Sequence, residues 1–309
     1  MKEAGVAVTV CIATYRRAER LAALLDDLQA QTRPPEQIVV VDNDPAGSAR
    51  AAVEAHRLRP GAPPLAYDIQ PEKSISLTRN RCVAHARGDW LAFLDDDERV
   101  VPHWLGDMLE TAARCRADGV LGPVVPVLPG DAPAWIRRGR FYDGPRLATG
   151  ARVPDNLMRI GNALIDGARL RREDPVFDPA YGLTGGEDGD LLLRLVRGGA
   201  LIVWCDSALA TEPVEPARLN ARWILMRALR GGQDYARHFR KGRLAGGPPS
   251  PARRAAFNLR ALAQMAAAAL LALAALPLGR HRALAWLARA CANYGKLSVL
   301  WGRHYREYA

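Results

Sequence analysis

The most informative stretch of the chain is Trp90-Leu91-Ala92-Phe93-Leu94-Asp95-Asp96-Asp97-Glu98, in which an apolar run ends in four consecutive acidic residues. A strand that carries oxygen ligands at its carboxyl end suits a divalent cation that bridges phosphates, because open α/β sheets bind their ligands there. A solvated strand end is the alternative. A second acidic cluster, Gly185-Gly186-Glu187-Asp188-Gly189-Asp190, follows about ninety residues later. Two clusters predict two roles, a metal ligand and a base.

Strand-like and helix-like patterns alternate around this stretch. Val6–Ala13 and Gln37–Val41 are β-rich, whereas Ala18–Ala30 repeats leucine at helical spacing. Residues 129–155 are rich in Gly, Pro and Arg without a period, so we expect a mobile loop. The alternation predicts one α/β domain over residues 1–216. Its further predicted strands are Leu65–Ile69, Trp90–Leu94, Val120–Leu128, Asn162–Asp166 and Leu201–Cys205, and its further helices are Ser74–Ala86, Trp104–Ala117 and Asp188–Val196.

Composition indicates a folded protein in a reducing compartment. The chain has 309 residues and an apolar fraction of 49%, which is ample for a core. Its five cysteines are odd in number, scattered and free of any Cys-x-x-Cys pair, so neither a disulfide framework nor a zinc site is indicated. The apolar run Val6–Ala13 lacks the basic start and cleavage site of a secretory signal. We therefore expect the catalytic part in the cytoplasm.

The basic charge of the chain is concentrated in its last third. Residues 217–309 carry 17 Lys and Arg against two acids, a net of +15, while the remainder carries 26 against 31, a net of −5. Such a tail suits nucleic acid or an anionic membrane surface. Ala261–Gly279 is an uncharged run of 19 residues dominated by Ala and Leu, which approaches the length of a membrane span. Lipid contact is therefore favoured over nucleic acid.

The tail is predicted to form helices that associate with a membrane. Arg218–Phe239 reads as a basic helix and Lys241–Pro251 as a linker. An apolar helix that ends near Pro277-Leu278-Gly279 follows, and Ala283–Trp301 reads as another helix. Basic residues flank the apolar segment on both sides, so a single crossing would place one basic cluster on the wrong side. We expect an interfacial or re-entrant hairpin near anionic lipids. Packing on the catalytic domain as an oligomer interface stays open.

Four segments, in order and spacing, resemble family 2 glycosyltransferases with the GT-A fold. They are Val8–Tyr15, Ile38–Asn43, Leu94–Asp97 and Gly185–Asp188, and the match covers residues 6 to 215. The downstream run from Arg218 to Gln233 resembles the bacterial exopolysaccharide branch, which includes succinoglycan-type glucosyltransferases. The resemblance implies a GT-A (Rossmann-like) mixed, mostly parallel sheet and a nucleotide-diphosphate-sugar donor, with UDP-hexose expected.

The resemblance assigns several residues to the donor. Thr14 and Tyr15 would line the base pocket, with the Tyr15 ring on a uracil face and the Asp42 carboxylate accepting from the uracil imide. Tyr15 packing on the sheet edge and Asp42 capping the next turn are the alternatives. Arg79 and Asn80 would lie beside the ribose and diphosphate, where a guanidinium fork suits phosphate. An arginine on a solvated helix face is the alternative for Arg79.

The resemblance also implies a cation, Mn²⁺ or Mg²⁺, at the acidic strand end. Asp97 would bind it directly and Asp95 through the ribose or a water. The histidine that often completes such a site after the last strand is absent from Ala210-Thr211-Glu212-Pro213, so Glu212 or water would substitute. Asn162 matches a position near the donor sugar, with a buried turn asparagine as the alternative.

Asp188 is the predicted general base. Attack of a sugar hydroxyl on the anomeric carbon needs a carboxylate opposite the leaving diphosphate, and one such base gives inversion. Glu187 would orient the acceptor, and the preceding glycine pair would let the backbone approach the sugar. An acidic helix start is the alternative reading.

The implied acceptor is a saccharide on a lipid diphosphate at the cytoplasmic face of the inner membrane, where the enzyme would be peripheral or monotopic. A nucleotidyltransferase remains an alternative, but it should carry a glycine-rich phosphate loop where Thr14-Tyr15-Arg16-Arg17 stands. A non-catalytic membrane scaffold is a second alternative, and it would need no base at Asp188.

Overall fold

The computed structural model describes residues 6–244, 247–302 and 304–306, and these fall into two compact units. Among them, the first unit holds residues 6–125 and 144–212, and the second holds residues 126–143 and 213–306 apart from the undescribed positions. Pro126–Asp143, which the sequence analysis placed in the α/β domain, therefore groups with the C-terminal helices.

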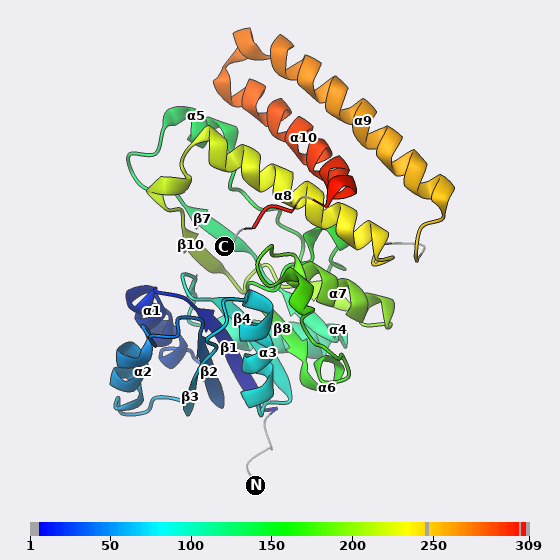
Figure 1. The fold of residues 1–309 in the computed structure, drawn as a ribbon. Helices are drawn as coiled ribbons and strands as arrows, with labels where there is room; N and C mark the ends of the chain where they lie inside the picture. Colours follow the sequence, from blue (N-terminus) through cyan, green and yellow to red (C-terminus); the bar gives the residue numbers. More distant parts are fainter. Residues whose placement is uncertain (1–5, 245–246, 303, 307–309) are drawn as a thin grey trace. The chain divides into compact units, whose positions relative to one another are not determined.

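The first unit is built on a seven-stranded sheet with the order β3-β2-β1-β4-β8-β6-β9 (Figure 1). Only β8 runs antiparallel to its neighbours β4 and β6, so the predicted mixed, mostly parallel sheet is confirmed. Thr14 pairs with Asp42, and the preceding Ala13 pairs with Asp95. This register brings three predicted site residues to one edge. The strands are β1 (Val8–Thr14), β2 (Gln37–Asp42), β3 (Leu65–Ile69), β4 (Trp90–Asp95), β6 (Gly119–Leu121), β8 (Ala163–Asp166) and β9 (Ile202–Trp204).

Alternate side chains of the strands point to the two faces of this sheet, and helices cover both faces. Val8, Val10 and Ile12 of β1 lie in one core cluster with residues of α1 (Ala18–Gln29), α2 (Arg50–Arg57) and α4 (Trp104–Cys115). The opposite face carries α3 (Ile75–His85), whose Cys82 thiol donates to the Ile12 carbonyl at 3.6 Å. Helices α6 (Gly167–Leu170) and α7 (Glu187–Arg197) complete the unit, with single turns at η1 (Asp155–Leu157) and η2 (Pro179–Tyr181).

Two parts of the fold differ from the sequence-based expectation. The segment predicted as an irregular loop contains α5 (Ala134–Gly139), a helix too short to show a clear period. A second, three-stranded sheet joins β5 (Arg99–Val100), β10 (Ala210–Pro213) and β7 (Val124–Val127) in the order β5-β10-β7. Its strands are only two to four residues long, so their pairing with distant strands decides their conformation rather than their own pattern.

The second unit contains three long helices, α8 (Ala221–Arg240), α9 (Pro251–Ala274) and α10 (Arg280–Ser298), with turns at η3 (Pro216–Arg218), η4 (Leu276–Leu278) and η5 (Val299–Trp301). Glycines let α8 and α10 approach closely, because a Cβ on Gly232 would lie 1.9 Å from the Ala292 carbonyl oxygen. A Cβ on Gly295 would likewise lie 2.1 Å from the Leu229 carbonyl oxygen. Beside this contact the Gln233 amide donates to the Ser298 hydroxyl at 2.8 Å.

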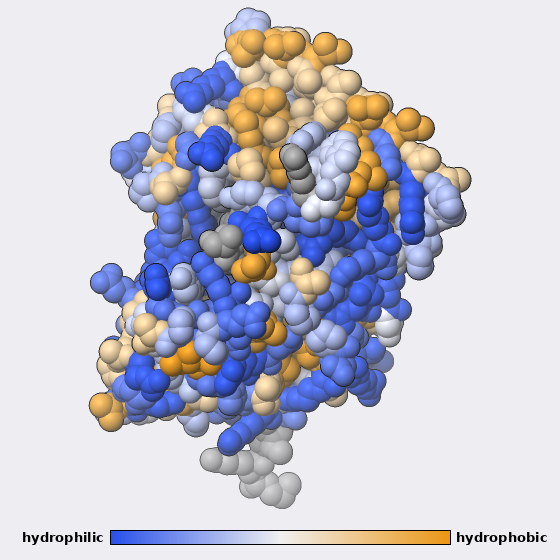
Figure 2. All heavy atoms as spheres, in the orientation of Figure 1, coloured by the Kyte–Doolittle hydropathy of each residue, from blue (hydrophilic) through white to orange (hydrophobic). Residues whose placement is uncertain are grey.

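Helix α9 starts at Pro251, the last residue of the predicted linker. The Ser250 hydroxyl accepts from the Arg253 amide at 3.3 Å, and proline occupies the first turn, where its missing N–H costs nothing. Length and composition would allow this helix to cross a membrane, with a mean hydropathy of 1.5 and only 17% of its apolar window buried. Figure 2 shows apolar residues gathered over α9 and the turn that follows it.

Gly88, between α3 and β4, is expected to tolerate no side chain. A Cβ there would lie 2.5 Å from the Thr9 nitrogen and 2.7 Å from the Trp90 oxygen, whereas a Cβ on Gly106 of α4 meets nothing within 4 Å. We expect Gly88→Ala to lower the free energy of unfolding by about 2 kcal/mol or more. Gly106→Ala should be neutral or stabilise by about 0.5–1 kcal/mol. Urea melts of both variants test this, and equal midpoints would contradict it.

Candidate active site

Asp96, the middle acid of β4's carboxyl end, ties together the ends of two strands. Its carboxylate accepts from the Thr14 hydroxyl at 2.7 Å, from the Tyr15 amide at 3.4 Å and from Arg17 at 3.0 Å. Burial raises the pKa of Asp96 to about 6, although the charge of Arg17 opposes this. Thr14 is thereby fixed beside the acidic strand end.

Asp97, the predicted direct metal ligand, is paired with two arginines. Its Oδ2 atom lies 2.8 Å from Arg17 Nη1 and 3.4 Å from Arg20 Nη1. The Asp97 side chain is only 4% exposed, so the two guanidinium groups compensate a nearly buried charge. The sequence analysis did not anticipate either arginine, because the pairing depends on the register of β1 against β4.

Glu98 is a buried acid with other carboxylates of the site close to it. Its Oε2 accepts from the Asp95 amide at 3.1 Å. Burial raises the pKa of Glu98 well above its ordinary value, and the nearby charges of Asp95, Glu212 and Asp97 raise it further. Glu212 therefore lies within electrostatic reach of the cluster. Among the described residues no three His, Cys, Asp or Glu side chains converge closely enough to hold a metal by themselves.

Arg79 connects the two acidic clusters. Its Nη2 donates to Asp95 Oδ1 at 2.9 Å, and its Nη1 donates to Glu187 Oε1. The Arg79 side chain is 10% exposed and that of Asp95 is 51% exposed, so the bridge runs from a buried interior to an open strand end. The strand end of β4 and the start of α7 therefore lie on either side of one guanidinium group.

Glu187 is a buried acid with one unsatisfied oxygen. Only 2% of it is exposed, and its Oε2 has no hydrogen-bond partner among the described residues. Burial raises the pKa of Glu187 to about 7; the charge of Arg79 opposes this shift and that of Asp188 adds to it. A buried carboxyl oxygen without a partner is costly, so this atom is suited to meet a hydroxyl of a bound molecule.

Asp188, the predicted base, lies half-buried in the first turn of α7. Its Oδ1 accepts from the Gly189 amide at 2.7 Å. The chain enters the helix through Gly185 and Gly186 with φ of 77° and 94°, a conformation that favours glycine. This turn brings the carboxylates of residues 187 and 188 to the helix start, where the helix dipole favours negative charge.

Asp42 and Tyr15, which were both predicted for the base pocket, differ in burial and in their partners. Asp42 is fully buried and accepts from the Asp44 amide at 2.9 Å, the Ala49 amide at 2.8 Å and the Tyr67 hydroxyl at 3.1 Å. This is the turn-capping alternative. The Tyr15 ring is half-buried, with Arg16 at 5.1 Å and Lys73 at 4.9 Å from its centroid.

The amides of Asn80 and Asn162 bind protein groups. Asn80 exchanges two hydrogen bonds of 2.8 Å with the backbone of Phe177. Asn162 is fully buried with φ of 58°; it accepts from Trp104 Nε1 at 2.7 Å and donates to the carbonyls of Pro123 and Ala208, both at 2.8 Å. Asn162 therefore has the geometry of the buried turn asparagine in the alternative interpretation.

Comparisons with known proteins agree with the predicted family. The family model described as glycosyl transferase family 2 matches residues 9–165. The succinoglycan biosynthesis protein ExoM of Rhizobium meliloti is 39% identical over 242 residues, which cover 74% of each chain. The galactofuranosyltransferase GlfT1 of Mycolicibacterium smegmatis is 28% identical over 228 residues, covering 67% of this chain and 70% of GlfT1.

Solved structures share the fold. The mannosyltransferase PcManGT of Pyrobaculum calidifontis, in complex with GDP-Man and Mn²⁺, matches with a TM-score of 0.65 and 19% identity, covering 98% of this chain and 89% of that one. TarS 1–349 of S. aureus, in complex with UDP-GlcNAc, matches with a TM-score of 0.55 and 19% identity, covering 97% and 93%. The predicted GT-A fold and the resemblance to succinoglycan biosynthesis proteins are confirmed, and the chain belongs to glycosyl transferase family 2.

Proposed function

We propose that the protein is an inverting glycosyltransferase that moves a hexose from a UDP-hexose to a lipid-linked saccharide in exopolysaccharide synthesis. The observation that carries this proposal is the Arg79 bridge between Asp95 and Glu187. It joins the acidic end of β4, proposed to face the diphosphate, to the acids at the start of α7, proposed to include the general base. The choice of product is supported by a relative that is a succinoglycan biosynthesis protein. The choice of donor is supported by TarS, a protein of the same fold solved in complex with UDP-GlcNAc.

Asp95, Asp97 and Glu212 are the residues proposed to hold Mn²⁺ or Mg²⁺. The crowding of carboxylates around Glu98 fits a divalent cation, because one cation would relieve their mutual repulsion. Asp97 can join the site only if its ion pairs with Arg17 and Arg20 open. When bound, the cation would neutralise charge on the departing diphosphate. Arg79, already at Asp95, is proposed to face the same diphosphate.

Asp188 is proposed as the general base, on the side of the donor sugar opposite the diphosphate. Its carboxylate would accept the proton of the acceptor hydroxyl while that oxygen bonds to the anomeric carbon and the bond to the diphosphate breaks. Displacement from the face opposite the leaving group inverts the anomeric centre. Glu187, with one oxygen held by Arg79 and the other unsatisfied, would orient the acceptor through a hydroxyl.

Tyr15 and Thr14 are proposed to border the nucleotide base. The Thr14 hydroxyl and the Tyr15 amide at the end of β1 both donate to Asp96, so both residues lie beside the acidic end of β4. Asp42, Asn80 and Asn162 are proposed to act indirectly, because their polar atoms fix turns and loops around the site. The structure thus suggests positioning roles for three residues that the family resemblance assigned to the donor.

Residues 217–309 are proposed to seat the enzyme on the cytoplasmic face of the inner membrane. The apolar and mostly exposed surface of α9 and the basic charge of this region support an interfacial hairpin near anionic lipids. A lipid-linked acceptor would then reach the enzyme at the surface where it grows. The oligomer-interface alternative predicts instead that the protein is released from membranes by salt.

Asp188→Asn should remove the base while keeping the size and shape of the side chain. We expect the rate of sugar transfer to fall by about 10²–10⁴-fold, with binding of the UDP-sugar nearly unchanged. Transfer is followed with radiolabelled donor, and binding by calorimetry. Glu110→Gln, on an exposed side chain of α4, is the matched control. Retained turnover in Asp188→Asn would exclude this residue as the base.

Removal of divalent cations should abolish transfer. We expect chelation to inactivate the enzyme and added Mn²⁺ or Mg²⁺ to restore it, because the diphosphate leaving group then has its charge neutralised. Asp97→Ala should weaken metal-dependent UDP binding by about tenfold or more, with Glu110→Ala as the control. Full activity in the presence of chelator would overturn the metal assignment.

Glu187 should make stability depend on pH. Its folded-state pKa is raised to about 7 from an ordinary value of 4.5, so the folded state holds the proton more tightly. This contribution to stability is complete below pH 4.5 and is lost as pH rises through 7. The stability of Glu187→Gln relative to the wild type should therefore increase between these pH values in urea melts. A difference independent of pH would contradict the shift.

A further inference from the structure

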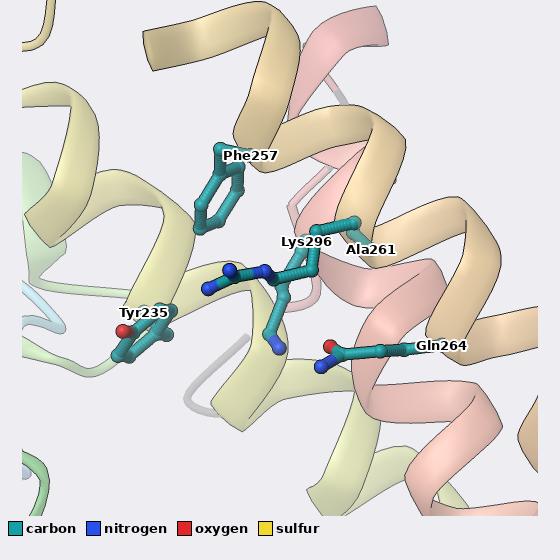
Figure 3. Close-up of a pocket in the computed structure, with 6 residues that line it drawn as sticks. Tyr235, Phe257, Ala261, Gln264 and Lys296 are labelled. Atoms are coloured by element: carbon teal, nitrogen blue, oxygen red, sulfur yellow. The ribbon is translucent and has the colours of Figure 1, made fainter.

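The second unit contains a cavity of about 240 Å³ between its long helices, lined by residues of all three. Tyr235 comes from α8, Lys296 from α10, and Phe257, Arg260, Ala261 and Gln264 from α9. Figure 3 shows the side chains of Tyr235, Phe257, Gln264 and Lys296 around one space, with the rings of Tyr235 and Phe257 on its border. Their rings stack on one another at 6.2 Å, and Phe257 also stacks on Phe239 at 4.3 Å.

Two cations of this cavity have no acidic partner. Among the described residues neither Arg260 nor Lys296 forms an ion pair. The Lys296 ammonium donates to Asn293 Oδ1 at 2.9 Å and lies 5.4 Å from the Tyr235 ring centroid. Burial lowers the pKa of Lys296 below its ordinary value, since the ammonium is partly withdrawn from water. Two neighbouring cations without a counter-charge make the cavity a site for an anion.

The surroundings of the cavity identify the kind of anion. Leu259 and Leu262 lie on the same turns of α9 as the lining residues and are 67% and 50% exposed. Leu270 and Leu273 continue this exposed stripe along the helix at 68% and 64%. Such a stripe suits the hydrocarbon region of a membrane, whose lipids carry a phosphate as well as hydrocarbon chains.

The charge of the unit points the same way. Residues 126–143 and 213–306 hold 20 Lys and Arg residues against four Asp and Glu residues, a difference of +16. Because one helical residue turns the chain by about 100°, the lining residues of α9 lie on the side of the helix opposite to the leucines. If the leucine stripe lies at the boundary of the acyl chains, the cavity faces the headgroups.

We propose that the cavity between α8, α9 and α10 binds the phosphate headgroup of an anionic membrane lipid through Arg260 and Lys296. The Gln264 amide would add a donor, and on the opposite side of α9 the leucine stripe would contact acyl chains of the surrounding bilayer. This inference rests on the membrane seat proposed above and assigns it a specific contact, in addition to the diffuse attraction of a basic surface.

The test compares two double variants of the full-length protein that lose the same charge from the same helices. Arg260→Gln/Lys296→Gln removes the cavity cations, and Arg254→Gln/Arg282→Gln removes two exposed cations of α9 and α10 outside the cavity. Binding to phosphatidylcholine vesicles, with and without one fifth phosphatidylglycerol, is measured by flotation. Two diffuse charges account for roughly a 30-fold loss at most. We expect the cavity variant to bind at least ten times more weakly than the control variant.

Each outcome separates the possibilities. Equal losses in the two variants would overturn the cavity site and leave only diffuse attraction. Equal wild-type binding to neutral and anionic vesicles would overturn it as well, while membrane association would stand. Absence of binding to any vesicle would overturn both the membrane seat and the cavity site. Release by inorganic phosphate, beyond that by chloride at the same ionic strength, would reassign the cavity to a soluble phosphate compound.

A second variant and a second readout protect the test against misfolding. Gln264→Glu places an acid beside the two cations and should weaken binding to anionic vesicles as strongly as the double variant, because it supplies the counter-charge within the protein. Helix content by circular dichroism should match the wild type in all variants. Hydrolysis of the UDP-sugar in solution is measured in parallel, so that loss of the proposed transferase activity is distinguished from loss of lipid binding.

Discussion

The site depends on one guanidinium group with a carboxylate on each side. Arg79 is nearly buried, and its charge is balanced by Asp95 at the end of β4 and by Glu187 at the start of α7. Removing one partner of a buried ion pair leaves an uncompensated charge, which costs several kcal/mol. The bridge therefore constrains the helix start that carries Asp188 to stay beside the acidic strand end.

A chain of polar contacts extends this constraint outward. Asp96 joins β4 to the Thr14 hydroxyl, and Arg17 joins Asp96 to Asp97. Several of these acids are held where water is scarce, which raises the pKa of Asp96, Glu98 and Glu187. Such a cluster stores charge repulsion that a cation or a bound hydroxyl would relieve. The same arrangement suits both halves of a displacement at an anomeric carbon.

Elements with a strong local pattern could be predicted from the sequence, and elements defined by distant partners could not. The leucines of α1 and the apolar run of β4 follow clear periods, whereas α2 buries only Val53 and His56 and was missed. Asp95 and Glu187 could be recognised as acids near a site, but their link through Arg79 joins residues far apart in the chain. Asn162 matched a family position, yet its three buried hydrogen bonds depend on Trp104, Pro123 and Ala208.

The most direct test of the account is a crystal structure with the donor UDP-sugar and Mn²⁺ bound. We expect the diphosphate beside Asp95 and Arg79, with the Asp188 carboxylate on the face of the anomeric carbon opposite the diphosphate. A diphosphate bound away from Arg79, or a sugar whose open face does not meet Asp188, would contradict the claim that the two acidic clusters form one transfer site.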